Sequence, residues 1–359
     1  MRKLFLLIAC ILLLSGTAIA ADIENELKED LQIGALTDAA PPETRSYFDS
    51  TENPELGIGS ILRDALQNSG QYWKEAIKTG VLLLLTVLLC TIVQLWPSEK
   101  LRTASTIAGV CAVTGCCAGN LKTMLGLGRS TILQFSDFSK VLLPSVAAAA
   151  AASGAPSGAA ALSTATMFVT DLLITFQQYV LLPLIGIYVA ISAACCASDS
   201  PQLDSLTKGI PSFFKQAMKI LLLAFSAYLT ITGVVSGTVD SLSLKAAKLT
   251  VSSTVPVIGS MLSDATESVL VSAKYLKNSI GLFGMLSVLA IGIVPFLQLG
   301  IHYLVLQATA FLTAMIDQTT LCKFIRALGE AMGFLLALTG ACAFLIFFSC
   351  IAFIRVVVP

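Results

Sequence analysis

One pair of residues in this sequence could support covalent catalysis. Ser157 lies between Pro156 and Gly158 in an interruption of an apolar region, and His302 is the only histidine. A serine activated by a histidine is the arrangement of intramembrane serine proteases. However, the residue two before Ser157 is Ala155 rather than glycine, and a lone histidine is more often a packed or interfacial side chain. A protease is therefore the less favoured hypothesis.

Metal and nucleotide chemistry have little support in the sequence. A single histidine rules out an H-E-x-x-H zinc site, and no G-x-x-x-x-G-K-[ST] sequence is present to bind nucleotide phosphates. The adjacent cysteines Cys116-Cys117 and Cys195-Cys196 suggest metal or redox chemistry, but no C-x-x-C exists. We interpret the cysteines as small, polarizable packing residues. No metal, no cofactor and no catalytic activity are predicted.

Asp171 is the one acidic residue embedded in a long apolar context, between the uncharged segments 141–170 and 172–198. An ionisable residue inside a membrane is a functional candidate by default, here as a proton or cation relay or as part of a transport path. Alternatively, Asp171 lies at a helix end near the lipid headgroups, because each flanking segment can hold a full span. The sequence favours the headgroup position but leaves both open.

The elements that position these residues must lie in a membrane. The 359 residues are 56% hydrophobic and only 12% charged, whereas soluble domains carry about 25% charged residues. The 22 basic and 22 acidic residues cancel, so the composition gives no reason to expect nucleic acid as a partner. The predicted fold is an all-α polytopic integral membrane protein.

The chain begins like a secreted or membrane protein. Arg2 and Lys3 precede an apolar run over 4–14, and small residues follow, including Ala18 and Ala20. This pattern predicts signal peptide cleavage between Ala20 and Ala21, with an uncleaved signal anchor as the alternative. Residues 22–78 then hold 12 acidic and 5 basic residues. We expect a signal peptide over 1–20, an acidic extracytoplasmic segment over 21–78 and a multi-pass membrane domain over 79–359.

Gaps between charged residues delimit the candidate spans, because charges are costly at the bilayer centre. The gaps are 79–98, 103–121, 141–170, 172–198, 220–239, 278–316 and 331–354. Since a crossing needs about 20 residues, the gap 278–316 has room for two helices that break near 295–301. The sequence therefore predicts seven to nine membrane-embedded helices.

Basic residues near the spans predict the orientation. The first span delivers the bases of 99–102 to the cytoplasm. Two further groups, at 208–219 and 323–326, suggest cytoplasmic loops. A fourth group at 245–277 does not fit the same simple serpentine, so the side of the C-terminus stays open.

Two stretches differ from plain spans. The first, 144–161, is rich in Ala, Gly, Pro and Ser, and Gly154, Pro156, Ser157 and Gly158 interrupt it. It predicts either a re-entrant or broken helix that lines a path, or a helix-packing seam with a short exposed loop. The second stretch, 244–280, has apolar residues at helical spacing from Ser260 onward. It predicts an amphipathic helix on the membrane surface or docked onto a partner, with a solvated face as the alternative.

The same second stretch carries a family resemblance. It contains Pro256-Val257-Ile258-Gly259, then Asp264-Ala265-Thr266, and then Leu276-Lys277-Asn278 leading into the next apolar segment. With the signal, the acidic segment, the span at 79–96 and the break at 153–161, this order resembles the stage III sporulation protein AE family of endospore-forming bacteria. The resemblance covers essentially the whole chain.

The resemblance implies a multi-pass protein of the mother-cell membrane around the forespore, with its N-terminal segment outside the cytoplasm. It implies a subunit of a secretion-like channel complex that is required for endospore formation, with a permease-like or export-apparatus-like role. The implied partners are the other stage III A sporulation proteins, including a secretion-type ATPase and ring-forming subunits, and the forespore stage II Q protein. The family supplies no catalytic residues. A stand-alone secondary transporter and a purely structural scaffold stay open as alternatives.

Overall fold

The computed structural model describes residues 38–40, 54–95, 99–152, 156–198, 201–254, 258–316 and 319–355. For several of these, including 156–163, 232–254 and 258–277, only the helical backbone is described. The signal peptide and its cleavage residues Ala20 and Ala21 lie outside the described residues. The described elements are α4 (Pro54–Gln94), α5 (Glu99–Ala152), α6 (Pro156–Phe176), the π-helical turn η1 (Gln177–Leu181), α7 (Leu182–Ser198), α8 (Pro201–Thr254), α9 (Ile258–Met315) and α10 (Thr319–Arg355).

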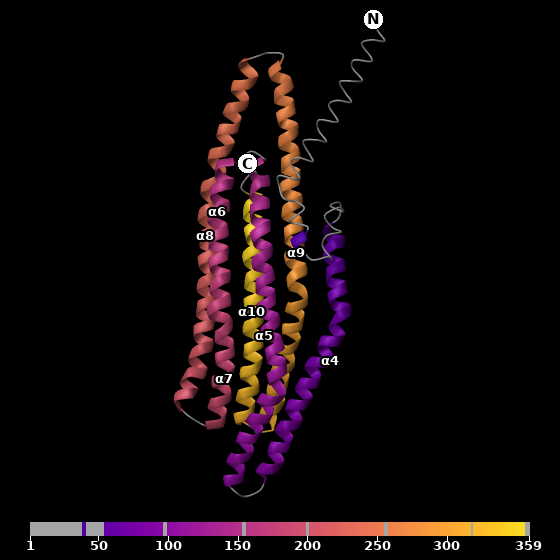
Figure 1. Ribbon diagram of the computed structural model, residues 1–359, viewed down its shortest axis with the longest axis vertical. Coiled ribbons are helices and arrows are strands. Elements are labelled where there is room, and N and C mark those ends of the chain that lie inside the picture. Colours follow the sequence, from indigo (N-terminus) through magenta and orange to yellow (C-terminus); the bar gives the residue numbers. More distant parts are fainter. Residues whose placement is uncertain are drawn as a thin grey trace.

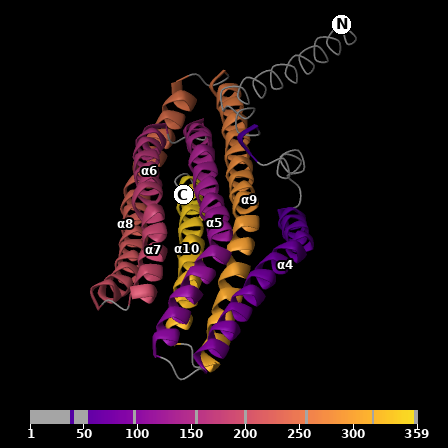
Figure 2. The same cartoon turned by 60° about the horizontal axis from the view of Figure 1, so that its bottom comes forward.

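The helices form one elongated bundle in which consecutive elements run up and down (Figures 1 and 2). The helices α6 and α7 continue one another through η1, so these seven helices make six long antiparallel rods. The helix α10 packs against α5, α6, α7, α8 and α9 and is the central helix of the described bundle. Fully buried aromatic side chains fill the interior, among them Phe135, Phe214 and Phe324.

Six stretches of the described chain are long and apolar enough to cross a membrane. They are Ser69–Gln94, Lys100–Ala151, Thr164–Ser198, Pro201–Ile231, Asn278–Met315 and Thr319–Ala352. The all-helical, multi-pass architecture agrees with the prediction. The described residues hold seven α-helices, against seven to nine membrane-embedded helices predicted, but these make six candidate spans rather than the seven that the charge-free gaps delimit. The difference arises because the charged residues between gaps 103–121 and 141–170 lie inside the single helix α5 and do not end it.

Internal prolines do not interrupt the long helices. Pro144 lies within α5, Pro211 within α8 and Pro295 within α9. The prediction of two helices over 278–316, breaking near Pro295, is therefore wrong: α9 runs through it. A proline removes one backbone hydrogen bond and disfavours a helix interior in water. It is tolerated in membrane helices, where neighbouring groups satisfy the freed carbonyl.

The amphipathic stretch is likewise not a separate element. Its first part ends α8 at Thr254, and residues 258–277 form the first turns of α9, which continues into the span that begins at Asn278. In Figure 1 the adjoining ends of α8 and α9 extend beyond the other helices of the bundle. These residues form an extension of the bundle, and their docking onto the membrane surface or onto a partner stays a prediction.

The bundle resolves the conflict among the basic groups. The connections α4–α5, α7–α8 and α9–α10 lie at the same end of the bundle, the lower end in Figure 1. The bases of 100–102, 208–219 and 323–326 follow these three connections, whereas 245–277 flank the α8–α9 connection at the opposite end.

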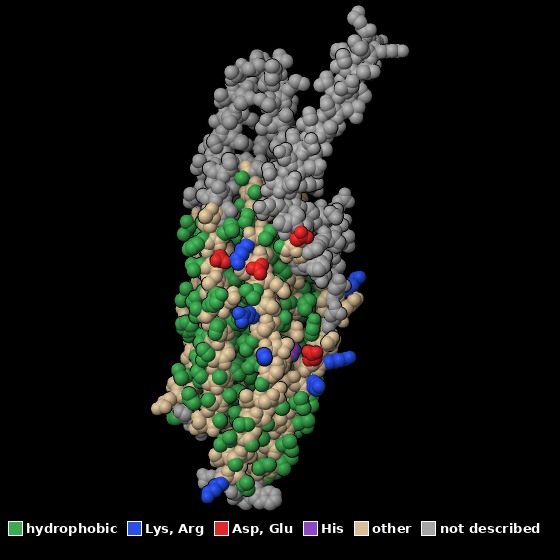
Figure 3. Space-filling model, in the orientation of Figure 1, with side chains coloured by type: hydrophobic (Ala, Val, Ile, Leu, Met, Phe, Trp, Pro, Cys, Tyr) green, Lys and Arg blue, Asp and Glu red, His purple; other side chains and the backbone are tan. Residues whose placement is uncertain are grey.

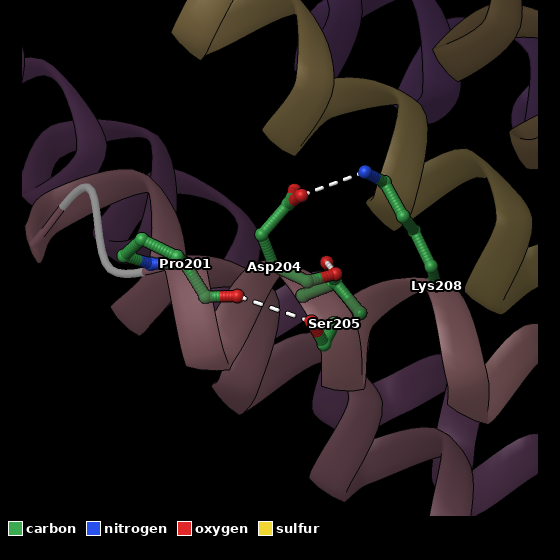
Figure 4. Close-up of polar contacts among 5 residues, drawn as sticks. Pro201, Asp204, Ser205 and Lys208 are labelled. Atoms are coloured by element: carbon green, nitrogen blue, oxygen red, sulfur yellow. Dashed lines mark hydrogen bonds and ion pairs between the residues drawn. The ribbon is translucent and has the colours of Figure 1, made fainter.

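At the start of α8, Lys208 pairs with Asp204 at 2.7 Å, and the Ser205 hydroxyl donates to the Pro201 carbonyl at 3.2 Å (Figure 4).

Candidate functional site

The predicted break at 144–161 becomes a connection between two helices. The helix α5 continues through the alanines to Ala152, and α6 begins at Pro156, so Pro156, Ser157 and Gly158 form the first turn of α6. Gly154 lies outside the described residues. Because α5 and α6 pack side by side as an antiparallel pair, the re-entrant alternative is not what the backbone forms. The predicted break thus falls where α5 ends and α6 begins, at one end of the bundle.

The structure does not bring Ser157 and His302 together. Ser157 lies at the start of α6, whereas His302 lies in the half of α9 nearer Met315, toward the opposite end of the bundle (Figure 1). The His302 side chain is buried, and its Nδ1 atom lies 2.8 Å from the Gln298 carbonyl oxygen of its own helix. This is the geometry of a packed histidine.

Asp171 lies on the outside of the bundle, beside α5. It lines a partly polar cavity of about 280 Å³, formed by Ser139, Lys140 and Leu143 of α5 and Met167, Phe168 and Asp171 of α6. Lys140 also pairs with Asp137, with Nζ and Oδ1 3.7 Å apart. Asp171 is therefore one of three charged residues gathered at the α5–α6 seam. Sequence reasoning singled out Asp171 but missed Asp137, and it used Lys140 only as the boundary of the gap 141–170.

The charges on α5 belong to a longer feature, which we name the α5 outer face. Its members are exposed and recur at steps of three and four residues, which keeps them on one side of the helix. They are Cys111, Gly115, Gly119, Lys122, Gly126, Arg129, Leu133, Asp137 and Lys140. Figure 3 shows charged side chains following one another down the face over α5.

This face differs from the outer surfaces of the other helices. Between Ala108 and Lys140, Leu133 is the only large hydrophobic side chain that is exposed. By contrast, α4 exposes an apolar surface suited to lipid, comprising Val81, Leu82, Leu85, Leu88, Leu89, Ile92 and Val93. The spacing of small and charged residues from 111 to 140 is visible in the sequence, so this signal was available before the structure.

The glycines of α5 fall into two classes. A Cβ atom at Gly109 would lie 2.6 Å from the Cys90 sulfur, and one at Gly128 would lie 3.0 Å from a Leu335 methyl carbon. These two glycines permit close packing inside the bundle. A Cβ atom at Gly115, Gly119 or Gly126 would meet nothing within 4 Å, so no neighbour within the described chain accounts for them.

Inside the bundle, polar contacts join the α6–α7 rod to α10. The Tyr188 hydroxyl donates to Glu330 at 2.7 Å, and the Cys342 thiol donates to the Gln177 side-chain oxygen at 2.8 Å. Gln177 is fully buried at the start of the π-helical turn η1, a type of distortion that is frequent at functional sites. Sequence reasoning missed both contacts, since each joins residues more than 140 positions apart.

The remaining predicted residues carry no site geometry. Pro256 lies outside the described residues, Gly259, Asp264, Ala265, Thr266 and Lys277 belong to the helical backbone of α9, and Asn278 is exposed. Within the described residues, no group of three or more His, Cys, Asp or Glu side chains could hold a metal ion.

Comparison with known proteins identifies the family. The model of the family described as stage III sporulation protein AE matches residues 51–357, which include all six candidate spans. The chain belongs to the stage III sporulation protein AE family. The resemblance seen in the sequence is thereby confirmed, and the protein is a sporulation membrane protein.

A named relative is similar over a shorter region. Stage III sporulation protein AE of Bacillus subtilis (strain 168) is 26% identical to this family member over 220 residues, which cover 60% of this chain and 55% of the relative. The match thus spans little more than half of the relative's length. No solved structure matches the chain.

Proposed function

We propose that this family member is a membrane subunit of a secretion-like channel complex between mother cell and forespore, required for endospore formation. Its role is permease-like or export-apparatus-like, without catalytic activity of its own, and a partner ATPase supplies the energy. The partners are the other stage III A sporulation proteins, including that secretion-type ATPase and ring-forming subunits, and the forespore stage II Q protein. The observation that supports the proposal most is the family match over residues 51–357, which spans the whole six-helix bundle.

The proposed location is the mother-cell membrane, with the N-terminal segment outside the cytoplasm. Support comes from the three connections at one end of the bundle, each followed by bases at 100–102, 208–219 or 323–326. Short cytoplasmic loops are enriched in Lys and Arg. That end is the cytoplasmic end in our proposal, and the α5–α6 connection and the end of α10 lie on the other side.

Within this proposal, the α5–α6 connection lines or gates the path. Its candidate residues are Gly154, Pro156, Ser157 and Gly158, with Asp171 farther along α6. Small residues at a helix connection permit the close backbone approach that a gating movement needs. Leucine at both Gly154 and Gly158 should therefore abolish spore formation in a strain that depends on the altered copy, while the protein stays inserted.

The matched control is Gly70→Leu, since Gly70 is exposed on α4 and a Cβ atom there meets nothing within 4 Å. Spore counts after heat treatment and membrane fractionation are the two measurements. Normal sporulation by the Gly154→Leu and Gly158→Leu double variant would refute a role for the connection. Normal sporulation of a strain that lacks the whole chain would refute the channel role itself.

A further inference from the structure

We infer that the α5 outer face is a docking surface for a membrane helix of another protein, one that carries carboxylate side chains about two turns apart. The inference rests on the exposure, spacing and charge of the residues from Cys111 to Lys140. It does not depend on what the complex transports, and it would hold for any membrane assembly of this chain.

Lipid is a poor occupant of this face. At 1.5 Å per residue, the stretch from Ala108 to Lys140 is about 48 Å long, whereas the hydrocarbon core is about 30 Å thick. Since α5 extends beyond this stretch only over 99–107 and 141–152, each shorter than a crossing of about 20 residues, a core that α5 crosses includes part of the face. Wherever Lys122 and Arg129 fall within the hydrocarbon, they face protein or water and not acyl chains, and Leu133 alone offers a large apolar surface.

The three unexplained glycines favour a helix as the occupant. Glycine in a helix interior costs roughly 0.5–1 kcal/mol relative to alanine, and a Cβ atom at Gly115, Gly119 or Gly126 would meet no packing neighbour among the described residues. In membranes, small residues four positions apart let a second helix approach its neighbour closely. Gly115 and Gly119 have this spacing on the α5 outer face.

The charges favour a partner of opposite sign over a second copy. Lys122 and Arg129 are seven residues apart on the face, and no described acidic group pairs with either. Copies inserted in the same sense and meeting face to face would set each base against its own counterpart, and like charges across an interface cost several kcal/mol. A helix with two carboxylates seven residues apart places one acid beside each base.

The test uses the full-length protein in phosphatidylcholine vesicles, with Cys111 as the reporter. The probe is a synthetic Leu/Ala transmembrane peptide of about 24 residues that carries two Glu residues seven positions apart. The matched peptide has Gln in place of Glu. Single-cysteine variants retain either Cys111, which lies on the face, or Cys116, which is exposed beside it, and the rate of modification by a lipid-soluble maleimide is measured.

We expect the Glu peptide to protect Cys111 at about tenfold lower concentration than the Gln peptide, the effect of two modest polar contacts in a membrane. Cys116 should be protected much less. The Lys122→Gln and Arg129→Gln double variant should lose the difference between the peptides, and the Lys122→Arg and Arg129→Lys double variant should keep it. Both changed residues are exposed, so the bundle should fold in each variant.

Three results would overturn the inference. The first is equal protection by the two peptides. The second is efficient Cys111–Cys111 disulfide formation between copies without peptide, which would assign the face to a second copy. The third is rapid modification of Cys111 by a charged, membrane-impermeant reagent in sporulating cells, which would show that the face lines water. The third result would refute the docking surface but not the channel proposal. Conversely, evidence that the protein has no channel role would not change the protection measured with the peptides.

Discussion

The Tyr188 hydroxyl donates a 2.7 Å hydrogen bond to a carboxylate oxygen of Glu330, and this contact joins α7 to the central helix α10. Tyr188 is buried and Glu330 is partly buried. A buried carboxylate that loses its donor keeps its desolvation cost without compensation, and a bond to a charged group contributes more than a neutral one. The pair therefore fixes the register of two rods.

We predict that Tyr188→Phe lowers the free energy of unfolding by about 1–3 kcal/mol, because it leaves a Glu330 oxygen unpaired. Glu330→Gln keeps an acceptor for the tyrosine and should cost less. Thermal unfolding in detergent, followed by circular dichroism, measures both. Tyr179→Phe is the control, since Tyr179 is 70% exposed and its hydroxyl has no such partner to lose. Equal midpoints for Tyr188→Phe and Tyr179→Phe would contradict the prediction.

Close packing between α5 and α9 leads to a second prediction. A Cβ atom at Gly284 would lie 2.6 Å from a methyl carbon of Leu142, which is fully buried and has little room to move. Gly284→Ala should therefore destabilise the bundle, by about 1–3 kcal/mol. Gly300→Ala, on the same helix, meets nothing within 4 Å and should stabilise it by roughly 0.5–1 kcal/mol. Unfolding midpoints that move in the same direction for both variants would be evidence against this packing.

Apolar segments made much of the fold predictable from sequence. The gaps 220–239 and 331–354 fall in α8 and α10, and residues 79–94 of the gap 79–98 fall in α4. Each has enough apolar surface to require burial in lipid or protein, and none offers a strong alternative to helix. The all-helical, multi-pass class follows from those segments alone.

The number of spans was not predictable from the same signal. Lys122 and Lys140 bound the charge-free gaps 103–121 and 141–170, yet both lie within α5, and Pro295 lies within α9. A charged residue ends a span only when it must reach water. A charged residue on a helix face that another protein covers does not have to reach water, so it does not end the span. Packing against α9 and α10 stabilises α5 as one continuous helix, and no local pattern reports that packing.

The candidate site was predictable only in part, for a related reason. Asp171 stands out because its surroundings in sequence are apolar. Lys140 does not stand out, since it follows other charged residues along α5. Their shared cavity depends on the antiparallel pairing of α5 with α6, and the contact of Tyr188 with Glu330 depends on the position of α10. Such pairings are tertiary.

The cavity at the α5–α6 seam predicts a charge-swap effect. Asp171→Lys would add a base beside Lys140 in the cavity, and since both positions are exposed the repulsion should be about 1 kcal/mol or less and lower spore formation modestly. The Asp171→Lys and Lys140→Asp double variant should recover much of the loss. Asp171→Asn separates the roles, because a proton relay would fail with asparagine while a side chain that only lines the cavity beside Lys140 tolerates this isosteric change. Unchanged sporulation with asparagine would exclude the relay, and unchanged sporulation with lysine would exclude both.

The positions of Ser157 and His302 predict that neither acts as a catalytic group. Ser157→Ala should leave spore formation unchanged, since alanine is compatible with the first turn of α6. His302→Ala should act through stability instead, because it removes a buried ring. Heat-resistant spore counts and protein levels in membranes distinguish these effects. Loss of sporulation with Ser157→Ala at a normal protein level would restore the protease hypothesis.

The arrangement of the rods predicts which connections share a side of the membrane. The test places single cysteines at Leu95, Ser198 and Ile316 in a chain whose own cysteines are replaced. These three positions lie at the ends of the rods that meet at the basic end of the bundle. A membrane-impermeant maleimide should label all three only after the cytoplasmic side is opened, because the bases that follow them retain that end inside. A cysteine at Ala155, in the α5–α6 connection, should be labelled from outside without opening the cells. Labelling of Ser198 from the side opposite Leu95 would require an odd number of crossings between them, which two antiparallel rods do not provide.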